Sequence, residues 1–598
     1  MFMQFRFIIV QVVFILFLQA VFSQLAKDYE VTTVLKEKFF DKSGAPLTGK
    51  GVVIGDVDSG IDVFHPLFFF ADGGEFSWTD VNGDGVLTFG TDGIDINGNG
   101  SIDKVEVLRY IDMLNSTWGL LPDGMSGKYN SVYDFIYIDA NGNNKRDFGP
   151  DKGFKETDPC FGEMMLIPVN YNKDNSIKAG EKLLGLKTSK IRSVLQRDGI
   201  IRRRGIDMIQ CEQDSSGHGT GVAGLIIGGY AGNQYFHGIA PEAEMIFSSV
   251  QYDYTPRFVR NFPDLFNFLK DEKVNIVLLE DGEWMYEFMD GSSPEEEILN
   301  EMARSGTTII GGAGNFTGSN MLILDTLRSG NEITYTASAP YMSDWKKNDG
   351  VFFSFLWPNT ETEIKITLQT PDNNTASFTS GEGKITAGKY NIFYAKEVSP
   401  KGTTMFRFGC STKDSQEVKG IWKFKLVSNG DAYLRAYVVD VSQSWAGYSR
   451  WKNSDKISDA SNVCFPSTAD SCMAIGAYTV NFGWGINDIV GDICDYSSVG
   501  YNITGKLGID ITAPGHSTLS AAKNNSYQVF SGTSSAAPHV VGAAALLLQY
   551  DMTLTHAQIK QILHNTAAQD NFTGTIPNHV WGYGKLNTEN AIRYLMNK

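Results

Sequence analysis

Positive charge is scarce in this chain of 598 residues. Lys and Arg number 51 against 68 Asp and Glu, and the formal net charge is −17. Proteins that bind nucleic acids need basic patches to neutralise phosphates, so this balance argues against a nucleic-acid partner. The tightest basic run is Arg202-Arg203-Arg204. We interpret it as a solvated surface turn, with an internal processing site as the alternative.

Long apolar runs are missing beyond the N-terminus. Only Phe7 to Phe22 is almost continuously apolar, and it follows Arg6 and precedes the small residue Ser23. This pattern predicts a signal peptide over residues 1–23, with an uncleaved membrane anchor as the alternative. We therefore expect a secreted or periplasmic protein that makes no membrane contact once the peptide is removed.

Cysteine is also rare, with six residues in the whole chain. Their spacing matches no zinc-binding pattern, but an even number in an exported protein is compatible with disulfides. Cys464 with Cys472 and Cys160 with Cys211 are the pairs to test first. The sequence alone leaves the pairing open.

What is present indicates a folded α/β protein of more than one unit. Hydrophobic residues make up 42% of the chain and charged residues 20%, as in soluble globular proteins. Apolar strands are expected at 51–58, 274–279 and 307–310, and helices at 262–270 and 294–304. Strands that alternate with helices of this size predict a parallel sheet covered on both faces.

Two stretches break this alternation. Residues 74–204 are rich in Asp, Asn and Gly, with little helical pattern before Gly180. Residues 331–443 alternate apolar and polar positions, as in 352–357, 363–368 and 421–426. That period of two predicts antiparallel strands with one buried face, and hence an inserted β-sandwich.

Four short segments carry the parts of a nucleophilic catalyst. A hydroxyl nucleophile needs a base, a carboxylate that orients the base, and donors for the oxyanion. Asp58 ends a predicted buried strand, and His218 lies in the small-residue run Gly217–Gly224. Asn315 ends the loop after a second strand, and Ser534 opens an apolar helix. A serine at a helix N-terminus has backbone N–H groups beside the developing oxyanion.

Together these segments resemble the subtilisin-like serine peptidases, whose catalytic residues follow the order Asp, His, Ser. The resemblance implies a three-layer fold around a parallel sheet, and a secreted endopeptidase that forms an acyl-enzyme. Ser534 would be the nucleophile, His218 the general base and acid, and Asp58 the residue that holds the imidazole. Asn315 and the Ser534 backbone N–H would form the oxyanion hole. His65 lacks the small-residue context, and we assign it to structure.

The resemblance divides the chain into three parts. The peptidase domain is expected over 24–73, 205–330 and 444–598. Residues 74–204 and 331–443 interrupt it, and the second interruption is similar to the jelly-roll-like modules of some bacterial members. The space before Asp58 is too short for the usual prodomain, so we expect either a different route of maturation or folding assisted by the insertions and calcium.

The cleft wall departs from the family pattern. A Ser-Leu-Gly-Gly-like strand usually lines the substrate cleft, and the matching stretch here is Leu279 to Trp284. We predict substrate contacts at Glu280, Asp281, Gly282 and Gly312. The carboxylates there favour a basic or polar substrate side chain, unless they are simply solvated.

Three stretches of the first interruption resemble calcium loops. Oxygen-bearing side chains at the first, third, fifth and ninth positions, with glycine near the sixth, suit a hard cation. We expect short aspartate-rich loops that lack the twelfth-position glutamate of an EF-hand, with metal-free Asn/Gly turns as the alternative. The predicted Ca²⁺ ligands are Asp80, Asn82, Asp84, Asp95, Asn97, Asn99, Asp103, Asp139, Asn141, Asn143 and Asp147.

The sequence leaves three functions to compare. The leading one is an exported endopeptidase that acts on protein or peptide substrates. The others are a catalytically silent module that binds a protein or glycan, and a maturation protease with one dedicated partner. The oligomeric state is left open.

Overall fold

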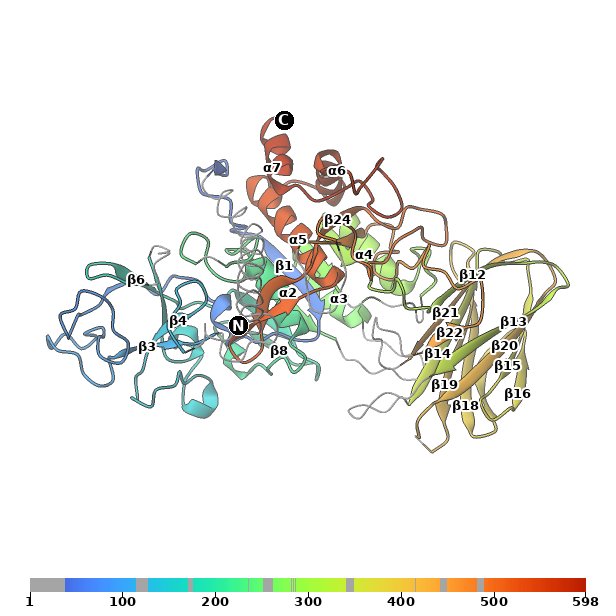
Figure 1. Cartoon of the computed structure of the whole chain (residues 1–598), viewed down its shortest axis with the longest axis horizontal. Coiled ribbons are helices and arrows are strands. Elements are labelled where there is room, and N and C mark those ends of the chain that lie inside the picture. The colour runs from blue at the N-terminus through green and yellow to red at the C-terminus, as the bar shows by residue number, and fades with distance from the viewer. Residues whose placement is uncertain are drawn as a thin grey trace, which may run out of the picture.

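The computed structural model describes residues 38–113, 127–169, 176–234, 236–250, 262–280, 282, 284, 287–339, 349–414, 416–440, 449–480 and 489–598. The predicted signal peptide and Asp281 lie outside these residues. Three parts lie side by side in Figure 1: the first insertion, an α/β core and a β-sandwich. Within the described ranges, no helix has both the length and the apolar character needed to cross a bilayer.

The core is built on an eight-stranded sheet, in which all neighbouring strands but one pair are parallel. This confirms the predicted α/β class. In spatial order the strands are β24 (Ile511–His516), β23 (Met473–Thr479), β11 (Thr308–Gly312), β10 (Ile276–Leu279), β1 (Val53–Asp58), β9 (Glu244–Ser249), β7 (Ile191–Leu195) and β8 (Ile201–Arg203).

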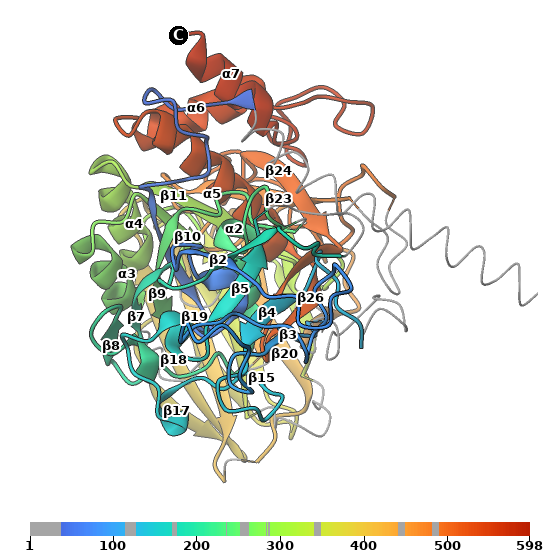
Figure 2. The same cartoon turned by 90° about the vertical axis from the view of Figure 1, so that its left-hand side faces the viewer.

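Helices cover both faces of this sheet, as the alternation of elements predicted. Helices α2 (His218–Ile227) and α5 (Thr533–Tyr550) lie on one face, and α3 (Phe262–Asp271) and α4 (Pro294–Arg304) on the other (Figure 2). Helix α4 has the predicted bounds because Ser293 and Glu296 form a capping box at its start. Helices α6 (His556–Thr566) and α7 (Thr588–Met596) follow α5.

The central strand β1 directs its side chains to the two faces alternately. Val53 and Val57 pack with α3 and α4, whereas Ile54 packs with α2 and α5. Residues two apart in a strand share a face, so Asp56 and Asp58 face α2 and α5 as well. This alternation directs the Asp58 carboxylate toward the helices that begin near His218 and Ser534.

The first insertion forms its own five-stranded antiparallel sheet with the order β2-β6-β5-β4-β3. Its strands are β2 (Glu75–Ser77), β3 (Leu108–Ile111), β4 (Phe135–Ile138), β5 (Met165–Pro168) and β6 (Lys182–Gly185), and the short 3₁₀ helices nearby are η1 (Pro66–Phe68), η2 (Pro150–Lys152), η3 (Pro159–Phe161) and η4 (Met208–Gln210). Strands β7 and β8 fall within the predicted range 74–204, yet they extend the core sheet beyond β9. The insertion sheet therefore ends at Gly185.

The second insertion is an antiparallel β-sandwich, which confirms the prediction. Its first strand, β12, and its last, β22, lie just outside the predicted range 331–443. One sheet contains β12 (Leu322–Leu327), β21 (Ala432–Asp440), β14 (Gly350–Trp357), β19 (Thr404–Thr412), β18 (Tyr390–Val398) and β17 (Glu382–Ala387). The other contains β16 (Thr375–Phe378), β15 (Ile364–Gln369), β20 (Gly420–Ser428), β13 (Glu332–Ala339) and β22 (Arg450–Lys452). A separate hairpin, β25 (Thr518–Ala522) with β26 (Ser526–Phe530), precedes α5.

The sandwich shares its hydrophobic core with loops of the α/β part. Trp284 lies between Phe316 and Tyr437, at ring-centroid distances of 4.1 and 4.9 Å. Arg435 of β21 donates hydrogen bonds to the backbone carbonyls of Tyr501 and Asn502, at 3.2 and 2.7 Å. The sandwich is thus packed against the loops that follow β10 and β11.

All six cysteines are buried as thiols, and none forms a disulfide. Neither of the two predicted pairs, Cys464 with Cys472 and Cys160 with Cys211, is formed. Burial raises the pKa of both Cys160 and Cys211 to about 12, so these thiols are neutral core side chains. The expectation of disulfides came from the predicted export, which does not determine how thiols pack.

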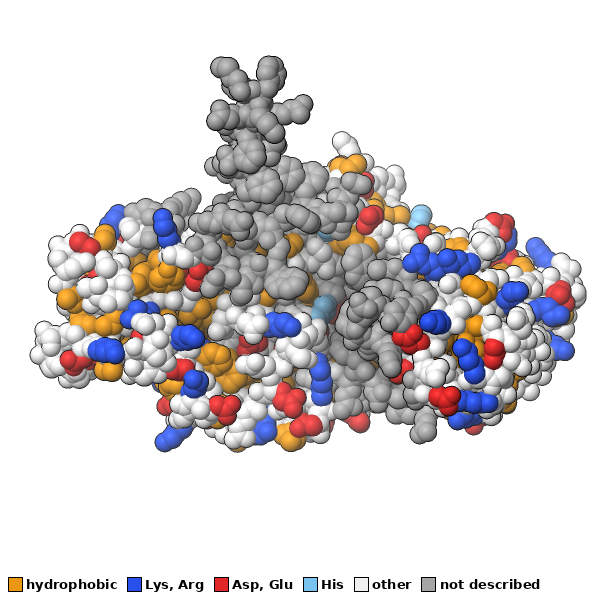
Figure 3. Space-filling model, turned by 60° about the horizontal axis from the view of Figure 1, so that its bottom comes forward, with side chains coloured by type: hydrophobic (Ala, Val, Ile, Leu, Met, Phe, Trp, Pro, Cys, Tyr) orange, Lys and Arg blue, Asp and Glu red, His pale blue; other side chains and the backbone are white. Residues whose placement is uncertain are grey.

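The arginine run at 202–204 lies on the edge of the core sheet and is held by carboxylates. Arg202 pairs with Asp207 at 3.0 Å, Arg203 with Glu272 at 2.6 Å, and Arg204 with Glu244 at 2.5 Å. These pairs favour a structural role over a processing site. Elsewhere on the surface, charges of both signs are interspersed over the face seen in Figure 3.

Candidate active site

The predicted catalytic residues come from one end of the core sheet. Asp58 is the last residue of β1, and Asn315 lies three residues after β11. His218 is the first residue of α2, and Ser534 is the second residue of α5. The carboxyl ends of parallel strands form the usual ligand crevice of an α/β sheet, and the four residues meet at that edge.

The carboxylate of Asp58 holds the imidazole of His218. His218 Nδ1 lies 2.8 Å from both Asp58 oxygens, and the backbone N–H of Ser59 donates to Oδ1 at 2.5 Å. The Asp58 side chain is 2% exposed and that of His218 is 36% exposed. With the proton on Nδ1, the more exposed nitrogen Nε2 is the one that can accept a proton from a nucleophile.

A second buried carboxylate, Asp214, supports this pair. It accepts hydrogen bonds from the backbone N–H and hydroxyl of Thr220, at 3.1 and 2.9 Å, and from the hydroxyl of Ser59 at 3.1 Å. It therefore ties the first turn of α2 to the residue after Asp58, at the positive end of the helix dipole. Our sequence analysis missed Asp214, although its place four residues before His218 is a recognisable signal.

The small residues around His218 are required by close packing. A Cβ atom on Gly219 would lie 2.3 Å from the Gly60 carbonyl oxygen and 2.5 Å from the Phe247 ring. Only glycine lets α2 approach β1 closely enough for His218 to reach Asp58.

Ser534 lies in the first turn of α5 and is 5% exposed. Two residues earlier, Gly532 has a φ of +124°, which favours glycine. Tyr496 holds the turn, because its hydroxyl accepts from the Gly532 backbone N–H at 3.0 Å and donates to the Gly515 carbonyl at 2.6 Å. These contacts connect the start of α5 to β24.

Asn315 is held in one orientation. Its Oδ1 accepts from the Thr533 backbone N–H at 2.8 Å and from the Thr533 hydroxyl at 3.3 Å. Behind it, Thr317 donates to the Ser497 carbonyl at 2.7 Å. Since Oδ1 is engaged, Nδ2 is the group that can donate to an oxyanion beside Ser534.

The predicted substrate contacts Glu280 and Gly312 lie together beside Thr533. A Cβ on Gly312 would lie 2.7 Å from Glu280 Oε2 and 2.8 Å from the Thr533 hydroxyl. Both carboxylate oxygens of Glu280 are buried, so this carboxylate is not the solvated group of the alternative interpretation. On Gly282, a Cβ would lie 2.6 Å from Cys464 Sγ, which shows how tightly this wall packs.

His65 is a core residue, as expected. Its Nε2 lies 3.1 Å from the Ser526 carbonyl oxygen, and its Nδ1 accepts from the Leu67 backbone N–H at 3.3 Å. Burial lowers the pKa of His65 to about 4, which keeps the ring neutral.

Comparison with known proteins identifies the family. The model of the subtilase family of peptidases matches residues 49–258 and 444–584, which is more than half of the chain. The chain belongs to the subtilase family. The unmatched residues 259–443 contain most of the β-sandwich, together with α3, β10, α4 and β11 of the core.

Curated relatives are similar over the subtilase domain only. Alkaline elastase YaB of Bacillus sp. (strain YaB) is 36% identical over 136 residues, which are 23% of this chain and 31% of the elastase. Serine protease AprX of Bacillus subtilis (strain 168) is 32% identical over 148 residues, which are 22% of this chain and 32% of AprX. The matches thus span less than half the length of these relatives.

A solved structure resembles nearly the whole chain. The CspB protease of Clostridium perfringens gives a TM-score of 0.60 at 17% identity, and the match covers 92% of this chain and 96% of that one. At this level of identity the likeness shows the fold alone.

The three predicted calcium loops share one geometry. In the second loop, Asn97 and Asn99 each place Nδ2 within 3.0 Å of Asp103 Oδ2. In the third loop, Asn141 and Asn143 approach Asp147 in the same way, at 2.6 and 2.7 Å. The side chains at the third, fifth and ninth positions therefore converge. Considering His, Cys, Asp and Glu alone, the described residues contain no group of three placed to hold a metal.

Each loop is closed by a carboxylate that our sequence analysis missed. Glu106 accepts from the backbone N–H groups of Ile96, Asn97 and Asp103, at 2.9, 3.0 and 3.0 Å. Counted from Asp95, Glu106 is at position twelve, so the expectation that this glutamate is missing was wrong for the second loop.

The other two loops use a carboxylate from a different position. Glu163 accepts from Ala140 and Asp147 at 2.8 and 2.9 Å. In the first loop, Asp92 accepts from Val81 and Thr88 at 2.9 and 2.7 Å. All three closing carboxylates thus bind the N–H groups at the second and ninth loop positions.

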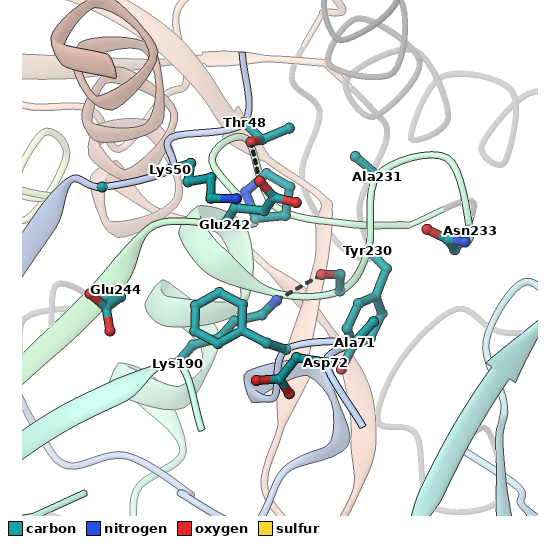
Figure 4. A pocket seen from close by; sticks show the side chains of 14 residues that line it. Thr48, Lys50, Ala71, Asp72, Lys190, Tyr230, Ala231, Asn233, Glu242 and Glu244 are labelled. Carbon is teal, nitrogen blue, oxygen red and sulfur yellow. Dashed lines mark hydrogen bonds between the residues drawn. The ribbon is translucent and has the colours of Figure 1, made fainter. Parts of the chain in front are cut away.

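A cavity of about 570 Å³ lies at the opposite end of the core sheet, beside the amino ends of β1 and β9 (Figure 4). In its wall, Thr48 donates to Glu242 at 2.7 Å. The ammonium of Lys190 donates to the carbonyls of Leu67, Ile227 and Gly229, at 3.2, 2.7 and 2.7 Å. All three N–H donors of the lysine are therefore satisfied within the protein, and this cavity is separate from the catalytic edge.

Proposed function

We propose that this subtilase is an exported serine endopeptidase that cleaves protein or peptide substrates through an acyl-enzyme. The observation that carries the proposal is the Asp58–His218 pair, at 2.8 Å, on the sheet edge where α5 begins with Ser534. The oriented amide of Asn315 supports it further. A silent binding module would have no need of this combination.

The proposed reaction follows from the geometry. Ser534 Oγ attacks the scissile carbonyl carbon while His218 Nε2 takes the hydroxyl proton, and Asp58 stabilises the resulting imidazolium. The Asn315 amide and the Ser534 backbone N–H donate to the oxyanion. His218 then gives the proton to the leaving amine as the peptide bond breaks. Water repeats the sequence on the ester and releases the acid product.

A fluorophosphonate probe tests this assignment. We expect the wild-type chain to be labelled, and Ser534→Ala and His218→Ala not to be. Labelling of Ser534→Ala, or none of the folded wild-type protein, would show that the assignment is wrong and would leave the silent binding module. Cleavage profiles of a denatured proteome then separate a general peptidase from a maturation protease with one partner.

For the substrate, we propose that the wall formed by Glu280, Asp281, Gly282 and Gly312 contacts the residue before the scissile bond. The carboxylate of Asp281 would favour basic or polar side chains, and the buried carboxyl group of Glu280 would add a polar contact without a charge. The tight packing of Gly282 and Gly312 supports a narrow wall. Peptide libraries that vary this residue test the proposal, and a preference for large apolar residues would contradict it.

We further propose that the loops of the first insertion bind Ca²⁺. The convergent side chains of the second and third loops, closed by Glu106 and Glu163, fit the oxygen-rich site that this ion prefers. Each Asn amide would turn its oxygen toward the ion. The ion would stiffen the insertion and take no part in catalysis. Calorimetric titration of the calcium-depleted chain tests this, and an absence of binding heat would refute it.

Export to a periplasm or out of the cell is supported by the apolar segment 7–22. N-terminal sequencing of the mature protein tests the predicted cleavage after residue 23. Retention of this segment would instead indicate the membrane anchor.

A further inference from the structure

Glu280 adds a carboxyl group to the catalytic end of the core sheet. It directly follows β10, whose Leu279 pairs with Val57 of β1 and with Gly311 of β11. Glu280 therefore lies level with Asp58 on one side and Gly312 on the other. Like Leu278, two residues earlier, it faces α2 and α5. This is the face that carries Ser534.

The carboxyl group is enclosed and incompletely bonded. Both of its oxygens are buried, and neither makes a hydrogen bond of ordinary geometry to the described residues. The Ser534 hydroxyl lowers the pKa of Glu280, and the Thr533 hydroxyl lies beside the same carboxyl group across Gly312. Hydrogen bonds of catalytic groups are often long in substrate-free enzymes and tighten when substrate binds.

The titratable groups around Glu280 favour its neutral form. Asp56 and Asp58 face it from β1, and the thiol of Cys472, just before β23 on the other face of the sheet, interacts with it only electrostatically. From α5 it meets the neutral hydroxyls of Thr533 and Ser534. Burial and the charges of Asp58 and Asp56 hold the pKa of Glu280 well above its ordinary value of 4.5, and the Ser534 contact offsets only part of this.

We propose that Glu280 is a further residue of the catalytic centre, whose neutral carboxyl group hydrogen-bonds the Ser534 hydroxyl and holds it for attack. This inference rests on the proposed peptidase function, because it assigns Glu280 a role toward its nucleophile. A neutral acid can hold the hydroxyl without adding charge. An ionised Glu280 would put a second anion beside Asp58 and oppose the developing oxyanion. Activity therefore falls with rising pH as Glu280 loses its proton.

The experiment follows the rate of fluorophosphonate labelling of the full chain from about pH 5 to about pH 10. We expect the wild-type rate to fall at the alkaline end. Glu280→Gln, which is neutral at every pH, keeps the acid-side rate within about 3-fold and loses the alkaline fall. Glu280→Met is neutral but cannot hydrogen-bond, so it also loses the fall and is about 10-fold slower throughout. Glu212→Gln is the control, because Glu212 is an exposed carboxylate beside Ser59.

Two results would overturn the proposal. One is a pH profile of the labelling rate that is the same for Glu280→Gln or Glu280→Met as for the wild type. The other is a folded Glu280→Gln that is more than about 100-fold slower at every pH, because it would show that the carboxylate must be charged. Failure of the peptidase function itself gives a different result, since the wild type would then not be labelled at any pH.

Discussion

The backbone N–H of Thr533 donates a 2.8 Å hydrogen bond to the side-chain oxygen of Asn315, across 218 positions of the chain. This bond sets which end of the amide faces the reaction. The bond also connects the loop after β11 to the first turn of α5. One contact therefore holds both donors of the proposed oxyanion hole, which are the Asn315 amide and the Ser534 backbone N–H.

Asn315→Ala removes one of these donors. We expect kcat to fall about 100- to 1,000-fold with little change in KM, the loss found when the corresponding donor is removed from a subtilisin. Burst kinetics with an ester substrate separate acylation from binding. Thr326→Ala, an exposed substitution in β12, is the control. A rise in KM at constant kcat would instead assign Asn315 to substrate binding.

Tyr437 tests whether the sandwich supports the active site. Tyr437→Ala removes the ring that packs on Trp284, 4.9 Å away, and we expect a loss of stability of about 3–5 kcal/mol. Because Trp284 also packs on Phe316, next to Asn315, we expect kcat/KM to fall between about 10- and 100-fold. Tyr433→Ala, four residues earlier on the same face of the strand but exposed, should leave both nearly unchanged. If kcat/KM stays constant in Tyr437→Ala, the sandwich contributes stability alone.

Glu296 should make the stability depend on pH. It is buried at the start of α4, accepts from Thr468 at 2.6 Å and from the Ser293 backbone N–H at 3.0 Å, and burial raises its pKa from 4.5 to about 7. The folded state thus holds a proton that the unfolded chain has lost. Its contribution to stability is full below about pH 4.5 and is lost as pH rises through about 7.

Urea unfolding at several pH values measures this slope. Glu296→Gln does not titrate and should flatten the slope in that window. Its single amide oxygen can accept from the Ser293 backbone N–H, and its NH₂ group can donate to the Thr468 hydroxyl. Glu295→Gln, one position away and partly exposed, serves as the control. An unchanged slope in Glu296→Gln would mean that another buried acid is responsible.

Glu163 tests the calcium proposal. We expect Glu163→Gln to weaken calcium binding by about 10- to 100-fold, because the third loop loses its closing carboxylate. Titration calorimetry and the calcium-dependent rise in melting temperature measure the effect. Glu181→Gln, an exposed substitution in the same insertion, should bind as the wild type does. Equal affinities of the two variants would contradict a site in this loop.

Features with a local signal were predictable. Asp58, His218, Asn315 and Ser534 each lie in a short segment with its own strand, turn or helix pattern, and their order completed the pattern. Both ends of helix α4 were predicted at the correct residue. The residues that cap its start are close neighbours in the sequence, so the signal is local. The sandwich followed from its period of two.

Features that depend on contacts distant in sequence were not predictable. Glu163 closes a loop that begins 24 positions earlier, and β7 joins the core sheet only through its pairing with β9. Glu280 was identified as unusual, but its burial against α5 depends on three neighbouring strands and one helix. The cysteines were judged by the predicted export, whereas apolar packing determines their state.

The sandwich lies within the chain between Asn315 and Ser534, and this order has a consequence for biosynthesis. A ribosome completes Asp58 and His218 early, but the nucleophile is added only after the entire sandwich has been made. A partly synthesised chain therefore has a base without a nucleophile. The chain gains its proposed chemistry only when α5 docks on a sheet already joined to the sandwich, so a truncated or stalled product cannot act as a stray protease inside the cell that makes it.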